Sequence, residues 1–283
     1  MWGGPWARGR DGAARGRDGS SAGGGAVEGL SAEAVGACAA LVERGDPDRH
    51  AAVMAAPVAA RGPLLVLYAF NLEVARAPWV TQEPMIAEMR LQWWRDVVAE
   101  AGAGRPARAH EVAGPLAVLI RQAGLPVAVL DALVEARRWD VYREPFEDRA
   151  ALEAYLEDTG AGLMWLAGRA LGAGAAAEAD LRAVGWAAGL AAYLRAVPEL
   201  EARGRQPLPE GVTVRDLAEL GLGRLAAARA ARKLVPKGVA AALLAGWQTE
   251  GLLRQVVAGR SSPELSEARK RWGLLWQAIR GQW

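Results

Sequence analysis

The chain has 283 residues, of which 52% are hydrophobic and 23% are charged, and its formal net charge is +2. This length suits one large domain, or one domain with a tail, and the hydrophobic fraction is enough for a sizeable core. The nearly balanced charge gives no electrostatic basis for binding nucleic acid. Cys38 is the single cysteine, which excludes an intramolecular disulfide and a cysteine-rich metal site and fits a reducing interior.

The first 29 residues form a Gly/Arg-rich segment in which the sequence ARGRDG occurs at 7–12 and again at 14–19. Such a segment cannot bury enough apolar surface to offset chain entropy, so we expect a disordered tail before a domain spanning residues 30–283. An arginine-rich targeting segment and an RNA-contacting tail are alternatives, which Asp11 and Asp18 weaken. Because this segment has no apolar core, we expect no signal peptide.

Helical periodicity begins after Ser31, a good N-cap. Pro47 opens a second helix, which we expect to run through Ala60. The next predicted helix starts at Pro63, because the N–H that proline lacks has no partner in a first turn anyway. Pro78 restricts the residue before it, so this helix should end or kink there.

Pro84 opens a helix that contains Trp93 and Trp94, and a Gly/Pro/Arg loop follows it. Further helices are expected at 112–123, 126–139, 150–171 and 175–202. A short helix should be capped by Thr213 and end before Gly221. The last helices are expected at 225–257, with a break near Pro236, and at 263–279. No segment alternates like a strand, and an alanine- and leucine-rich composition favours helix, so we predict an all-α fold. The longest apolar run is far short of the roughly 20 residues of a membrane-spanning helix.

Two blocks of the sequence carry a resemblance to a known family. The first begins with Tyr68-Ala69-Phe70 and ends, one helix later, with Arg-Leu-Gln-Trp-Trp-Arg at 90–95; the second is GLAAYLRAVPELEARGRQPLP at 189–209. In this order the blocks resemble the two signatures of the squalene/phytoene synthase family, over roughly residue 47 to the C terminus. The resemblance implies a single-domain, isoprenoid-synthase-like helical bundle around a central cavity.

Enzymes of that family carry two aspartate-rich motifs, whose carboxylates hold magnesium against a diphosphate. By the resemblance, the first motif falls on Ala75, Arg76 and Trp79, and the second on Ala196 and Leu200. None of these side chains is a carboxylate. We therefore expect no catalytic residues, no metal site and no cofactor.

Nearby glutamates offer an alternative magnesium site. Glu73 lies on roughly the opposite side of its helix from Ala75, and Glu199 lies about 100° around the helix axis from Leu200. Neither rebuilds a clamp of two carboxylates four residues apart, and the alternative is that they face solvent or form local ion pairs. If they did hold magnesium, the chain would be an active phytoene synthase-type prenyltransferase that condenses two isoprenoid diphosphates.

Other family positions keep side chains that suit a vestigial pocket or its phosphate side. They are Tyr68, Arg76, Arg90, Trp94, Gly160, Arg195 and Arg205. An arginine fork suits phosphate, but pairing with acids such as Glu73, Glu88 or Asp140 is the structural alternative. Small residues around Gly160 either allow close helix packing or make room for a ligand.

The loss of these aspartates resembles the motif losses in one branch of the family. That branch includes a mitochondrial respiratory complex I assembly factor and its bacterial relatives. This implies a non-catalytic binding or assembly protein, with respiratory complex subunits as partners and an isoprenoid or lipid ligand. A lipid or isoprenoid carrier without turnover is a third hypothesis. The C-terminal helix, with Trp272, Trp276 and Trp283 among basic residues, suits peripheral membrane contact or packing on the domain. We expect a cytoplasmic protein, or one peripheral to the inner membrane.

Overall fold

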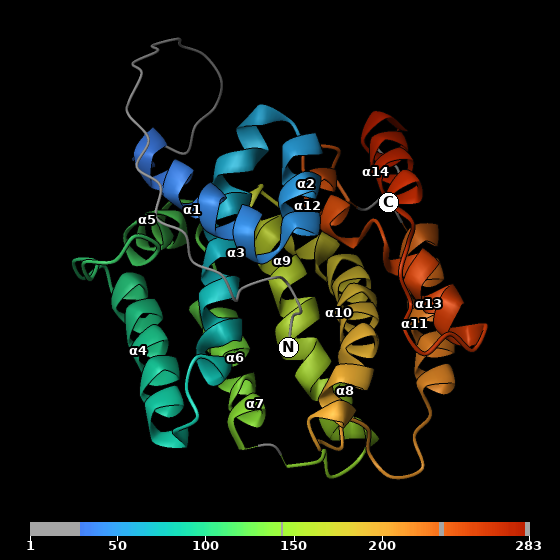
Figure 1. The fold of residues 1–283 in the computed structure, drawn as a ribbon. Coiled ribbons are helices and arrows are strands. Elements are labelled where there is room, and N and C mark those ends of the chain that lie inside the picture. The colour runs from blue at the N-terminus through green and yellow to red at the C-terminus, as the bar shows by residue number, and fades with distance from the viewer. Residues whose placement is uncertain (1–28, 143, 232–234, 281–283) are drawn as a thin grey trace.

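In the computed structural model, residues 29–142, 144–231 and 235–280 are described, and they form a bundle of helices (Figure 1). The helices are α1 (Ala32–Gly45), α2 (Pro47–Ala55), α3 (Val58–Arg76), α4 (Pro84–Gly102), α5 (Ala113–Ala123), α6 (Val127–Ala136), α7 (Arg138–Tyr142), α8 (Arg149–Leu156), α9 (Gly162–Ala170), α10 (Glu178–Ala202), α11 (Val214–Ala230), α12 (Ala240–Leu243), α13 (Thr249–Val257) and α14 (Glu267–Arg280). Shorter 3₁₀ turns lie at Ala77–Trp79, Ala175–Ala177 and Leu244–Gly246, and a π-helical turn lies at Glu157–Ala161. Because these ranges contain no strand, the all-α prediction is confirmed.

α3, α9 and α10 run through the centre of the bundle, and helices flank them on two sides (Figure 1). α4 to α7 lie on one side, whereas α11, α13 and α14 lie on the opposite side (Figure 1). α10 packs against α11, α9 and the π-helical turn, and α1 packs against α3. Phe70 in α3 and Trp186 in α10 are the largest fully buried side chains.

Helix starts follow the capping and proline signals of the sequence. The Ser31 side chain accepts the N–H of Ala34 at 3.1 Å and so begins α1. Pro47 and Pro84 are the first residues of α2 and α4. α3 ends at Arg76, just before Pro78, as the sequence predicts.

Two predicted boundaries around Pro57 are wrong. The helix that Pro47 opens ends at Ala55 instead of Ala60, because Pro57 restricts the residue before it to extended backbone. Residues 58–60 instead begin α3, so Pro63 lies inside that helix and does not start it.

Other segments also differ from prediction. α11 is not short: it passes Gly221 and reaches Ala230. A Cβ built on Gly221 would lie 2.9 Å from Leu190 and 3.0 Å from Leu253, so this glycine allows close helix packing inside α11. The predicted helix at 126–139 breaks at Arg137, and α14 starts at Glu267, four residues after Pro263.

α3 and the turn after it, Val58–Trp79, would be long and apolar enough to cross a membrane by length and composition alone. However, 78% of the most apolar window is buried inside the fold, and α3 runs through the centre of the bundle. Its apolar sequence is therefore explained by the core that it forms.

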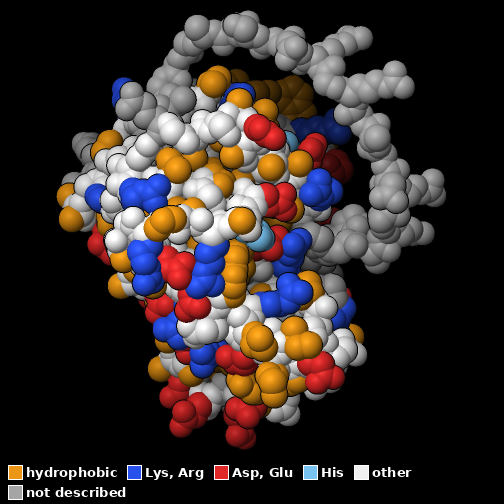
Figure 2. Space-filling model, turned by 90° about the vertical axis from the view of Figure 1, so that its left-hand side faces the viewer, with side chains coloured by type: hydrophobic (Ala, Val, Ile, Leu, Met, Phe, Trp, Pro, Cys, Tyr) orange, Lys and Arg blue, Asp and Glu red, His pale blue; other side chains and the backbone are white. Residues whose placement is uncertain are grey.

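Charged side chains of both signs lie among hydrophobic ones on the side of the molecule that carries α4 (Figure 2). This mixture agrees with the small net charge of the chain. The predicted tail at 1–29 lies outside the described residues except for Gly29, and so does Trp283.

Candidate functional site

A cavity of about 500 Å³ lies inside the bundle, bordered by α3, α8, α10 and α13. Tyr68 and Asn71 of α3 lie on one wall, and residues 185–200 of α10 supply much of another. At its open end the cavity is lined by Asp48 of α2, Arg195 of α10 and Lys270 of α14. The cavity is thus enclosed by helices from both halves of the sequence.

One wall of the cavity is made of glycines at which two segments cross. Gly160 of the π-helical turn faces Gly185 and Gly189 of α10, and all three line the cavity. A Cβ on Gly160 would lie 2.7 Å from the Gly185 carbonyl oxygen and 2.9 Å from the Gly189 Cα. Close backbone approach therefore requires glycine here, and the same small residues leave the cavity its width.

The inner end of the cavity holds a buried polar network. The Tyr155 hydroxyl accepts from Arg137 Nη1 at 2.6 Å and donates to Asp140 Oδ2 at 3.0 Å. All three side chains are buried and line the cavity. Asp140 was predicted only as an acid that could pair with an arginine, and Arg137 and Tyr155 were not predicted to be site residues. The three-residue spacing of Arg137 and Asp140 was the one signal in the sequence.

Tyrosines around the cavity are held in their protonated form. Burial raises the pKa of Tyr68 to about 12. Burial also raises the pKa of Tyr155 and of Tyr193 above the ordinary tyrosine value. The Tyr193 hydroxyl donates to the carbonyl of Pro207 at 2.5 Å. These phenols are therefore hydrogen-bond donors and not bases at neutral pH.

The positions that the resemblance assigns to family aspartates are mostly on the cavity wall. Trp79, Ala196 and Leu200 line the cavity, whereas Ala75 is buried without lining it. In the parts of the chain that the structure describes, no three His, Cys, Asp or Glu side chains lie close enough together to hold a metal ion. The wall at these positions is apolar.

The predicted phosphate-side arginines do not converge on one point. Arg76 pairs with Glu73, and Arg195 Nη1 lies 3.7 Å from Asp48 Oδ2 at the open end of the cavity. Arg90 is exposed on α4 and does not line the cavity. Arg205 is buried, but it donates to the carbonyls of Trp139 and Asp140 at 3.1 and 3.3 Å.

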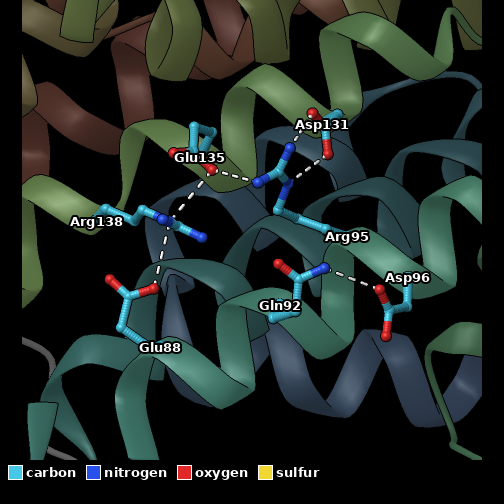
Figure 3. A network of polar contacts seen from close by, with 7 residues as sticks. All are labelled: Glu88, Gln92, Arg95, Asp96, Asp131, Glu135 and Arg138. Atoms are coloured by element: carbon cyan, nitrogen blue, oxygen red, sulfur yellow. Dashed lines mark hydrogen bonds and ion pairs between the residues drawn. The ribbon is translucent and has the colours of Figure 1, made fainter. Parts of the chain in front are cut away.

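The run at 90–95 contributes to packing and not to the cavity. Trp94 is buried and meets Phe70 edge to face, with ring centroids 5.4 Å apart. Arg95 donates to both Asp131 oxygens at 2.7 and 2.9 Å and to Glu135 at 2.6 Å, which joins α4 to α6 (Figure 3). In the same network Arg138 lies between Glu135 and Glu88 (Figure 3). Of the predicted site residues, Tyr68, Trp79, Gly160, Arg195, Ala196 and Leu200 are therefore the ones brought together.

Asp48 at the open end was not among the predicted site residues. It contacts Arg195 at 3.7 Å and Lys270 Nζ at 3.8 Å, so it connects α2, α10 and α14. Nothing in the sequence pairs these positions, because they lie on three helices that only the fold brings together.

The family profile described as squalene/phytoene synthase matches residues 42–244. Among curated proteins, the chain is 28% identical over 178 residues to the Bos taurus protein named NADH dehydrogenase (ubiquinone) complex I, assembly factor 6. The aligned region covers 61% of this chain and 52% of that protein. The Drosophila melanogaster homologue of that factor is 32% identical over 182 residues, covering 61% and 52%. The chain thus spans about half the length of the curated relatives it matches.

Solved structures share the fold. A dehydrosqualene synthase in complex with ligand superposes with a TM-score of 0.73 at 17% identity, covering 87% of this chain and 95% of that one. The squalene synthase HpnC from Alicyclobacillus acidocaldarius gives a TM-score of 0.66 at 18% identity, covering 85% and 94%. With the family match over most of its length, the chain belongs to the squalene/phytoene synthase family.

Proposed function

We propose that this chain is a non-catalytic member of its family that acts in the assembly of a respiratory NADH dehydrogenase. The observation that carries the proposal is the cavity wall at Trp79, Ala196 and Leu200, which offers an indole, a methyl group and an isobutyl group. Departure of a diphosphate leaves charge that magnesium must neutralise, and magnesium needs oxygen ligands in octahedral geometry. These three side chains supply none.

The acids that do border the cavity are engaged by cations. Asp48 lies between Arg195 and Lys270, and Asp140 lies 3.5 Å from Arg137 Nη1. Glu199, next to Leu200, pairs with Arg203 at 3.1 Å across one helical turn. This donor set does not fit a magnesium–diphosphate pair, because no two of these carboxylates are presented as a shared clamp.

The assembly role is supported by the relatives. Those reported above are named as complex I assembly factors, and they share the family. Because the matched region is about half of each relative, the assembly activity of the whole relative is carried to this chain only as part of the proposal.

The assembly role is testable by deleting the gene in its host. We expect less assembled NADH dehydrogenase on native gels and lower NADH oxidation by membranes, with succinate oxidation unchanged as the control for other respiratory enzymes. A plasmid copy of the chain should restore the enzyme. Normal NADH dehydrogenase together with loss of an isoprenoid product would contradict the proposal and favour an active synthase.

A second candidate function is binding of an isoprenoid or lipid without turnover, which the size and apolar wall of the cavity favour. Sites for small molecules are typically of this volume and mostly apolar. Farnesol should raise the midpoint of thermal unfolding by about 2 °C or more at saturation, equally with and without magnesium. Ala192→Phe, which would fill the cavity, should abolish the shift, and Ala99→Phe on the exposed side of α4 should not. A shift that needs magnesium, or one that survives Ala192→Phe, would argue against this second function.

A further inference from the structure

The C-terminal helix α14 presents an exposed hydrophobic face. Trp272 is 71% exposed, Leu275 49%, Trp276 55% and Ile279 72%. Positions three, four and seven apart lie on one side of a helix, so these side chains form a single strip. Exposed large hydrophobic groups gathered in this way are uncommon on a protein surface and mark a contact.

The opposite face of α14 fixes the rotation of the helix. Gln277 Nε2 donates to the carbonyl of Trp247 at 3.2 Å, and Lys270 Nζ lies 3.8 Å from Asp48 on α2. Leu274 packs against the core. Since these contacts hold the inward side, Trp272 and Trp276 lie on the outward side of α14.

Arginines flank the exposed strip. Arg269 and Arg271 lie on either side of Trp272, rotated from it around the helix axis by about 60° and 100°. Both side chains are exposed. Neither forms an ion pair with any residue in the described ranges. A hydrophobic strip rich in tryptophan between cationic flanks is typical of helices that lie in the interface of an anionic membrane.

We propose that the outward face of α14 binds the surface of an anionic lipid bilayer. α14 lies at an edge of the bundle, where a flat surface can reach it (Figure 1). A second copy of the chain packed with its α14 parallel to this one would bring the arginines of both copies together. Tryptophan rings suit the lipid headgroup region, where an apolar body and a polar N–H are both accommodated.

The inward side of the same helix borders the cavity. Lys270 lines the open end of the cavity and contacts Asp48 there. A bilayer bound to the exposed strip would lie on the opposite side of α14 from the cavity. The membrane contact goes beyond the proposed assembly function and does not depend on it.

The test is flotation of the full chain with vesicles of phosphatidylcholine alone or of phosphatidylcholine mixed with phosphatidylglycerol. We expect binding to the anionic vesicles. The double variant Trp272→Ser with Ile279→Ser should lose roughly tenfold or more in partitioning, because two large apolar groups no longer enter the interface. Met85→Ser with Met89→Ser is the matched control, since these α4 side chains are 75% and 66% exposed and should not affect binding.

The contribution of charge is tested separately. Arg269→Gln with Arg271→Gln should weaken binding to anionic vesicles several-fold, and added salt should weaken binding of the unchanged chain. Arg90→Gln, an exposed arginine on α4, is the control and should bind normally. Circular dichroism and thermal unfolding confirm that each variant is folded.

Three outcomes would overturn the proposal. The first is no flotation of the unchanged chain, and the second is equal flotation of the α14 and α4 hydrophobic variants. The third is that vesicles are not bound, whereas the chain forms a concentration-dependent oligomer or binds only an acidic protein, and the α14 variants abolish that association. None of these outcomes bears on whether the cavity can hold magnesium, so failure here is distinguishable from failure of the proposed function.

Discussion

Single residues decide the chemistry of the cavity. Where a carboxylate could ligate a cation, Ala196 offers one methyl group and Leu200 a branched apolar chain. At the inner end, Arg137 is held by Tyr155 and Asp140, so this buried cation is already neutralised within the protein. The cavity wall is thus apolar at positions 196 and 200, and the charge of Arg137 is paired with Asp140 at the inner end.

The glycine crossing on the cavity wall predicts a large effect of one methyl group. A Cβ on Gly185 would lie 2.4 Å from the Met164 Cβ and 2.6 Å from the Gly160 carbonyl oxygen. Gly185→Ala should therefore lower the free energy of unfolding by about 2 to 3 kcal/mol, because the backbone crossing must open. Gly223→Ala on the exposed side of α11 meets nothing within 4 Å and should raise it by about 0.5 to 1 kcal/mol.

Urea denaturation of both variants measures these changes. Equal stability of the Gly185→Ala protein and the parent would show that the two segments do not cross so closely.

Cys38 is predicted to be unreactive in the folded protein. It is fully buried in α1, and burial followed by the charge of Glu111 raises the pKa of its thiol to about 12. At pH 8 the thiol is therefore protonated and shielded from reagents. Ellman's reagent should react with it only after guanidinium unfolding, and rapid labelling of the native protein would contradict the buried placement.

At the scale of elements, the network around Arg95 ties α4 to α6. Its side chain is 29% exposed, and its partners Asp131 and Glu135 are 36% and 45% exposed, so solvent screens part of the interaction. Arg95→Met keeps the apolar stem and should lower the free energy of unfolding by about 1 kcal/mol, an effect that shrinks in high salt. Arg215→Met, which breaks a pair within the exposed face of α11, should change it by less than about 0.5 kcal/mol.

Thermal or urea unfolding at low and high salt tests this comparison. If Arg95→Met lowers the free energy of unfolding by no more than Arg215→Met does, the interhelix network adds nothing beyond a surface ion pair.

Some helix boundaries were predictable from the sequence because caps and prolines act locally. Ser31 and Pro84 begin helices and the left-handed Gly124 ends one, as expected. Other boundaries were not predictable: α3 begins at Val58 and not at Pro63. α11 continues past Gly221 because that glycine packs against Leu190 and Leu253, which lie on α10 and α13 and are not neighbours in sequence.

At the scale of the whole molecule, the N- and C-terminal parts of the described chain meet at the open end of the cavity. Lys270 of α14 contacts Asp48 of α2 and is only 16% exposed. Lys270→Met should therefore loosen α14 and speed amide hydrogen exchange in 267–280, while the global unfolding transition changes little. Arg269→Met, in the same helix but without an ion pair in the described ranges, is the control. Unchanged exchange in the Lys270 variant would contradict the proposed anchoring of α14.

The candidate site was only partly predictable for the same reason. Tyr68, Trp79, Ala196 and Leu200 were found because they lie inside the two blocks that resemble family signatures, and all four line the cavity. The contact of Tyr155 with Arg137 and the meeting of Asp48 with Lys270 arise from packing between separate helices, which no local pattern encodes. Arg76 lies inside the first block but pairs with Glu73 and stays off the cavity.

The chain belongs to the squalene/phytoene synthase family, and we propose that its cavity does not support prenyl transfer. The most direct measurement is release of pyrophosphate when the purified chain is incubated with geranylgeranyl or farnesyl diphosphate and magnesium. We predict no release above a heat-inactivated sample of the same protein. Release that requires magnesium and is accompanied by a condensed isoprenoid product would contradict the claim.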